Sequence, residues 1–103
     1  MKVVIESKHL PTIFTLEHGG VPAGVTIDIP EVIERRGVGF ETVATAILSF
    51  GSGVAAGVLA NWLYEKLHGK PSTRLTINRI EVQITRDDII RVIQEEITKE
   101  EKP

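Results

Sequence analysis

The sequence predicts an α+β fold, in which a small antiparallel or mixed sheet packs against helices. The chain has 103 residues, which is the size of one domain. Its β-branched residues gather in short stretches that are typical of strands. A long uncharged block and an amphipathic C-terminal stretch are instead typical of helices. We therefore expect residues 1–103 to form a single domain around one core.

Three strands and a short helix are expected in the first part of the chain. Residues 2–6 contain the apolar run Val-Val-Ile, and residues 12–17 mix β-branched and aromatic side chains in alternation. Residues 24–29 alternate apolar and polar side chains, which is the pattern of a half-buried strand. Residues 31–36 are expected to form a short helix, because a proline precedes them and a glycine follows them.

The central part of the chain carries no charged side chain over residues 42–64. We expect one long apolar helix over about residues 41–68, rich in glycine and alanine. Gly69 and Pro71 mark its end, because glycine can adopt the left-handed cap and proline cannot continue a helix. A helix without a charged face is buried in a core or spans a membrane. This helix is long for so small a domain to cover alone, which indicates that a second copy buries part of it.

The last third of the chain is expected to form one bulged strand and one amphipathic helix. Apolar positions in the strand, residues 74–85, change phase at Asn78-Arg79, which indicates either a bulge or a hairpin turn. We favour one bulged strand because Asn-Arg is a poor two-residue turn. Apolar residues recur at helical spacing over residues 86–99, and two aspartates near the start suit the positive end of the helix dipole. The charged tail, about residues 99–103, is expected to fray.

Composition and motifs argue against several classes of function. Twelve Lys and Arg against 14 Asp and Glu give a net charge of −2, so no nucleic-acid partner is expected. The absence of cysteine excludes disulfides, thiolate catalysis and cysteine-based zinc sites. The three histidines lack a metal-binding spacing, and no catalytic or phosphate-binding motif is present. We expect no catalytic residue, no metal and no cofactor, and therefore a protein that is not an enzyme.

Small residues recur along one side of the expected central helix, at a spacing that lets a second helix approach closely. We therefore expect a cytoplasmic, self-associating protein-interaction module, a dimer or higher homo-oligomer. A role as an accessory or inhibitor of another protein would suit such a module. The expected self-association residues are Ala46, Ser49, Gly53, Gly57 and Ala60.

Three arginines offer a second candidate surface for a partner. Arg74, Arg79 and Arg86 follow the uncharged block and would form a basic face that an acidic partner or an RNA backbone could contact. The competing interpretation is ordinary charge pairing with the acidic last helix, and we favour that interpretation because nucleic-acid readers usually add exposed aromatic side chains.

Two alternative interpretations of the central block lead to other functions. In the first, residues 42–64 form a transmembrane helix that assembles through Gly53 and Gly57, with the C-terminal part in the cytoplasm. In the second, the block is a strand over residues 43–50, a glycine turn and a helix over residues 54–68, and its glycines resemble a dinucleotide-binding fingerprint. This second alternative is the weaker one, because the next strand lacks the acid that would hold a ribose. The glycines of that fingerprint are Gly51, Gly53 and Gly57.

Overall fold

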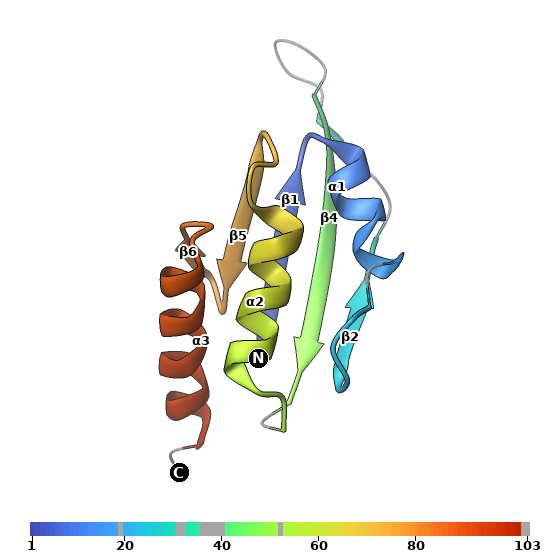
Figure 1. Cartoon of the computed structure of the whole chain (residues 1–103). Coiled ribbons are helices and arrows are strands. Elements are labelled where there is room, and N and C mark those ends of the chain that lie inside the picture. Colours follow the sequence, from blue (N-terminus) through green and yellow to red (C-terminus); the bar gives the residue numbers. More distant parts are fainter. Residues whose placement is uncertain (19, 31–32, 36–40, 52, 102–103) are drawn as a thin grey trace.

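The computed structural model describes residues 1–18, 20–30, 33–35, 41–51 and 53–101 (Figure 1). It confirms the α+β class: an antiparallel sheet is covered by helices on one face. The elements in chain order are β1 (Lys2–Ser7), α1 (Leu10–Phe14), the 3₁₀ turn η1 (Leu16–His18), β2 (Val25–Asp28), β3 (Ile33–Arg35), β4 (Glu41–Phe50), α2 (Ala56–Leu67), β5 (Thr73–Ile77), β6 (Ile80–Val82) and α3 (Arg86–Glu101).

The sheet has the strand order β2-β4-β1-β5-β6, and β3 pairs with the beginning of β4. Every pairing is antiparallel, so the expectation of an antiparallel sheet is confirmed. The register places Val4 of β1 between Ile47 of β4 and Thr76 of β5. Strands β1 and β4 therefore form the centre of the sheet.

Burial alternates along the central strands with the period of two that a strand imposes. Val3 and Ile5 of β1 and Ala46 and Leu48 of β4 are fully buried on the face that the helices cover. Their neighbours in sequence, such as Val4 and Ile47, point to the opposite face and are half-buried.

Helices α1 and α2 lie in front of the sheet in Figure 1, and α3 stands beside α2 next to β6. Helix α2 buries Leu59, Leu63 and Leu67 at helical spacing, so one of its sides packs into the core. Helix α3 contributes Ile89 and Ile93 to the same core. All three helices thus use the same face of the sheet.

The expected single helix over residues 41–68 is wrong. Residues 41–50 form strand β4, and the helix begins only at Ala56. In β4 the β-branched Val43, Thr45 and Ile47 alternate with smaller or apolar side chains that face the core, which suits a pleated strand. The alternative interpretation of the block, a strand over residues 43–50 followed by a helix to residue 68, is nearly correct in its boundaries.

The expected strand over residues 12–17 is also wrong, because this stretch lies in α1 and η1. Pro11 stands in the first turn of α1, where its missing N–H is not needed. The Thr15 hydroxyl donates to the Pro11 carbonyl at 2.7 Å, which closes the turn. Ile13 and Leu16 are then three residues apart on the same side, and both are fully buried.

The bulged strand expected over residues 74–85 is instead the hairpin of β5 and β6. Asn78 and Arg79 both have positive φ, 47° and 71°, as a two-residue type I′ turn requires. Asparagine tolerates this conformation, whereas arginine adopts it at a cost.

Two smaller expectations also need correction. Residues 33–35 form strand β3, not part of a helix over residues 31–36, and the other residues of that helix lie outside the described part of the chain. The C-terminal helix is confirmed, but it continues to Glu101, so the described part of the tail is helical.

Candidate interaction surface

The sheet face opposite the helices, which we call the open face, carries no helix among the described residues. Its centre is apolar, because Val4 and Ile47 lie side by side there and Val43 lies further along β4. Thr45 and Thr76 border this centre and are also half-buried. An apolar centre with a polar border is the arrangement of many protein–protein interfaces.

Charged side chains lie on both sides of the apolar centre of the open face. Lys2 and Glu6 are two residues before and two residues after Val4 on β1, so all three point to this face. On β5, Arg74 lies opposite Glu6 and its Nε is 3.3 Å from Oε1 of Glu81 on β6. Neither Lys2 nor Glu6 has a side-chain ion pair with another described residue. Strand β1 thus presents on the open face one cation and one anion that form no ion pair with the described part of the chain.

Two depressions flank this central row. One, of 590 Å³, is lined by Glu6, Lys8, Val43 and Arg74 among others. The other, of 310 Å³, is lined by Lys2, Val4, Thr76, Asn78 and Arg79. Both are partly open to solvent.

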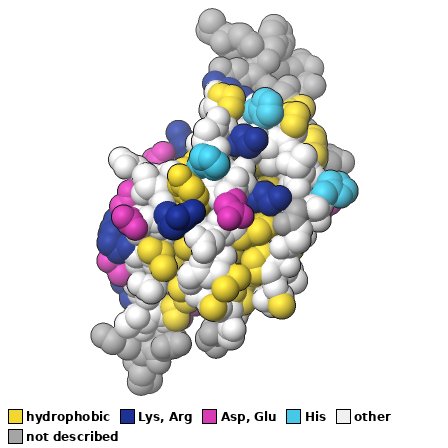
Figure 2. Space-filling model, in the orientation of Figure 1, with side chains coloured by type: hydrophobic (Ala, Val, Ile, Leu, Met, Phe, Trp, Pro, Cys, Tyr) yellow, Lys and Arg dark blue, Asp and Glu magenta, His cyan; other side chains and the backbone are white. Residues whose placement is uncertain are grey.

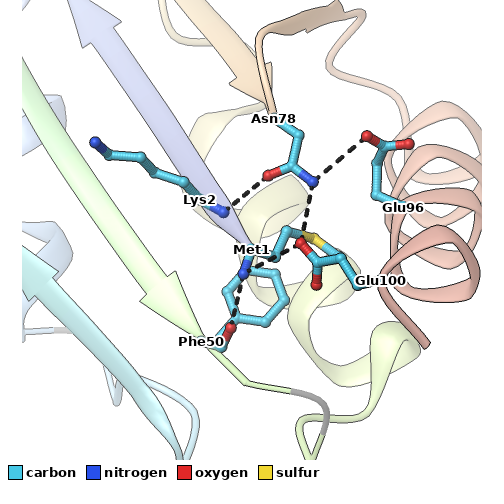
Figure 3. Close-up of polar contacts among 6 residues, drawn as sticks. All are labelled: Met1, Lys2, Phe50, Asn78, Glu96 and Glu100. Carbon is cyan, nitrogen blue, oxygen red and sulfur yellow. Dashed lines mark hydrogen bonds and ion pairs between the residues drawn. The ribbon is translucent and has the colours of Figure 1, made fainter. Parts of the chain in front are cut away.

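Asn78, in the β5–β6 turn, connects the end of the open face to α3 through hydrogen bonds (Figure 3). Its Oδ1 accepts a hydrogen bond from the backbone N–H of Lys2 at 3.0 Å. Its Nδ2 donates to Oε1 of Glu96 at 3.4 Å and to Oε1 of Glu100 at 3.3 Å. The amide therefore joins β1, the β5–β6 turn and the last helix, and it fixes the backbone from which the Lys2 side chain extends.

Two carboxyl groups of the α3 region are stabilised in their charged form. The hydroxyl of Thr85 and then the guanidinium of Arg91 lower the pKa of Asp88, and Thr85 also accepts the Asp88 N–H as a helix cap. The ammonium of Lys99, whose Nζ lies 3.0 Å from Oε2 of Glu96, and then the amide of Asn78 lower the pKa of the buried Glu96. In both cases partial desolvation opposes the shift but does not cancel it.

Acidification should therefore destabilise the fold. Because the folded-state pKa values of Asp88 and Glu96 lie below their unfolded values, their stabilisation is complete above the unfolded values of about 4 and is lost as the pH falls through the folded ones. Urea unfolding at neutral pH and at steps below pH ~4 would measure the loss. Glu96→Gln should lose less stability on acidification than the unsubstituted chain; an equal loss would contradict a contribution from Glu96.

The five residues expected to mediate self-association do not share a surface. Ala46 and Ala60 are buried in the core, on β4 and α2 respectively. Ser49 is exposed on the open face, Gly53 lies in the connection between β4 and α2, and Gly57 is exposed in the first turn of α2. The common helix side on which they were grouped does not exist, because the chain changes from strand to helix between them.

The three arginines are also separated. Arg74 is paired with Glu81 on the open face, and Arg79 occupies the β5–β6 turn. The guanidinium of Arg86 lies over the Tyr64 ring at 4.8 Å, and that ring also stacks on His68. They line different depressions, so the structure does not bring them together as one basic face.

The geometry of the central block bears on both alternative interpretations, and its course from strand to helix is that of the second one. No helix within the described ranges is long and apolar enough to cross a membrane. Gly51, Gly53 and Gly57 do follow a strand and precede or begin a helix, but the strand is antiparallel to its neighbours, unlike the parallel strand of a dinucleotide-binding unit. Nor do three or more His, Asp or Glu side chains of the described residues gather where they could hold a metal ion.

The helix-covered side has a different character (Figure 2). Figure 2 shows Lys, Arg, Asp, Glu and His side chains scattered over it, with hydrophobic side chains visible between them. Val58 of α2 is 57% exposed and Phe14 of α1 is 42% exposed. Isolated exposed apolar side chains of this kind are ordinary in folded proteins.

Sequence reasoning missed Val4, Ile47, Lys2 and Glu6 as surface residues. The signal was present for β4, because β-branched residues occupy alternate positions from 43 to 47. Because these residues were expected to belong to a long helix, the sheet face that β4 shares with β1 could not be predicted.

These features define the class of the molecule: an α+β protein with helices on one face of an antiparallel sheet and an open second face. The chain matches no protein-family model, no curated protein and no solved structure.

Proposed function

We propose that the protein is a small non-enzymatic interaction module that self-associates through its open face. The observation that carries the proposal is the row of half-buried apolar side chains centred on Val4 and Ile47, which no helix of the described residues covers. Burial of this row would remove apolar area from water, the main favourable term in protein association. A second copy supplies the same apolar row, so the two surfaces match in character.

Replacing Ile47 by Lys should convert the assembly to monomers. The charged side chain would stand in the apolar centre, where a second copy would have to desolvate it. Sedimentation equilibrium at several micromolar concentrations should give about twice the chain mass of 11.3 kDa for the unsubstituted protein and the chain mass for the variant. Circular dichroism would show that the variant remains folded.

Two control variants separate the open face from the surface of α2. Val58→Lys places the same charge at an exposed position on the helix-covered side. Gly57→Leu introduces a large side chain at one of the glycines that the sequence predicted to form a contact between two helices. Gly57 is exposed, and a Cβ there would meet Ile90 Cδ1 at 3.9 Å, an ordinary van der Waals contact. Both controls should keep the mass of the assembly. A monomeric unsubstituted protein, or a folded Ile47→Lys variant of unchanged mass, would refute the proposal.

A further inference from the structure

The charges of the open face distinguish between possible arrangements of two copies. This step rests on the proposed function, because it assumes that open faces meet. Of the twofold axes that lie between the two faces and keep Val4 opposite Val4 of the second copy, two limiting directions differ in the charges that they bring together. An axis along β1 places Lys2 on Lys2 and Glu6 on Glu6, so like charges meet. An axis across β1 exchanges the two directions along the strand, so Lys2 of each copy faces Glu6 of the other.

We infer that two copies pack open face to open face about a twofold axis that crosses β1 at Val4, held in register by two reciprocal Lys2–Glu6 ion pairs. Both side chains lack an ion pair within the described part of their own chain. Sheets that pack face to face stand about 10 Å apart, a gap that an extended lysine and a glutamate together can bridge. The second copy thus supplies what each chain lacks.

The same axis gives suitable neighbours to the rest of the central surface. Ile47 meets Ile47 and Thr76 meets Thr76 of the second copy, while Ser49 meets Thr45, because these positions are related by the register of β1 with β4 and β5. Arg74 meets the polar end of the strand at Asn78 and keeps its own Glu81. No like-charged pair is created in the centre.

Like charges meet away from β1. Arg74 comes near Arg79 of the second copy, because Arg79 follows Asn78 and lines the same depression as Lys2. Asp28 on β2 and Glu81 on β6 each lie opposite their own counterpart. Packed sheets cross at an angle of about 30°, so outer strands diverge more than central ones. Rim charges are also screened by water and salt, and their effect on affinity is small. Because a twofold contact uses each surface completely, the assembly closes at two copies and does not grow into a filament.

Complementary charge reversal tests this arrangement. Lys2→Glu gives a chain with an acidic side chain at both positions, and Glu6→Lys gives a chain with a basic side chain at both. Alone, each variant places like charges at both contacts, and its dimer should weaken by about tenfold or more. Mixed in equal amounts, the two variants place opposite charges at both contacts and should form a heterodimer. Fluorescence transfer between differently labelled variants would measure it, and rising salt should weaken the preference.

The possible results separate this inference from the proposed function. Glu65→Lys, a charge reversal on the exposed side of α2, should leave the dimer unchanged and serves as the control. If Ile47→Lys dissociates the dimer but the folded variants do not pair when mixed, the arrangement is wrong and the open face remains the site. If either reversed variant alone dimerises as tightly as the unsubstituted chain, the reciprocal pairs are refuted. If Ile47→Lys stays dimeric, the open face itself is refuted, and the arrangement fails with it.

Discussion

Replacing Leu63 by Ala should lower the free energy of unfolding by about 2–5 kcal/mol, the largest effect expected from a single side chain here. Leu63 is 0% exposed and lies in the middle of α2, between the helix and the sheet. Its truncation removes apolar contacts and leaves a cavity that neighbours such as Leu59 and Leu67 fill only in part. For a domain with a total stability of about 5–15 kcal/mol, this is a large share.

Val58→Ala on the same helix provides the matched control. Val58 is 57% exposed, so its truncation removes few contacts and should change stability by no more than about 0.5 kcal/mol. Urea midpoints at equal protein concentration would give both values, since stability of a self-associating protein depends on its concentration. Similar losses for the two variants would mean that α2 does not present its Leu63 side to the core.

The class of fold could be predicted from the sequence because local patterns decided it. The apolar run within residues 2–6, the alternation of residues 24–29 and the helical spacing of residues 86–99 each agreed with their surroundings in the fold. Each of these elements has one buried side, and the spacing of its apolar residues in the sequence indicates which side that is. The amphipathic last helix was therefore the most accurate expectation, and only its end, at Glu101, lay further along.

The central block could not be assigned by charge alone. Both a core-facing strand and a helix that packs on it lack charged residues, so β4 and α2 merged into one uncharged run. Length favoured a helix, whereas the alternation of Val43, Thr45 and Ile47 favoured a strand. Of the glycines that looked like a packing motif, Gly53 lies where the chain passes from strand to helix and Gly57 lies in the first turn of α2.

The assignment of the central block to one helix affected the prediction of the interaction surface more than it affected any single helix or strand. The open face is made by pairing β1 with β4 and β5, which are far apart in sequence. Its register, and hence the position of Lys2 and Glu6 around Val4, is a property of long-range pairing that no local pattern contains. The small residues Ala46 and Ala60 illustrate the converse: their size suited a helix contact in the sequence, but in the structure both are buried in the core, one on β4 and the other on α2.

The β5–β6 turn was missed for a related reason. Asn-Arg is not a favoured sequence for a two-residue turn, because arginine rarely adopts positive φ. In the structure Asn78 supplies tertiary hydrogen bonds that hold the turn in place. These bonds join residues of β1 and α3, so their stabilisation could not be read from the local sequence.

Asn78→Ala should lower the free energy of unfolding by about 2–3 kcal/mol, the second large effect. Alanine at a φ of 47° carries the cost of the left-handed conformation. The substitution also removes the acceptor of the Lys2 N–H and one of the hydrogen bonds that the buried Glu96 accepts (Figure 3). Because both losses act on the junction of β1, the turn and α3, thermal unfolding should show a clearly lower Tm.

Two further substitutions in the turn separate backbone strain from hydrogen bonding. Asn78→Gly keeps the freedom to adopt positive φ but loses the amide, so it should be less destabilising than Asn78→Ala by about 1–2 kcal/mol. Arg79→Gly should instead stabilise the fold, because it relieves an arginine held at a φ of 71°. Equal losses for Asn78→Ala and Asn78→Gly would assign the whole role of Asn78 to its hydrogen bonds. A destabilised Arg79→Gly would show that Arg79 contributes more through its side chain than its backbone conformation costs.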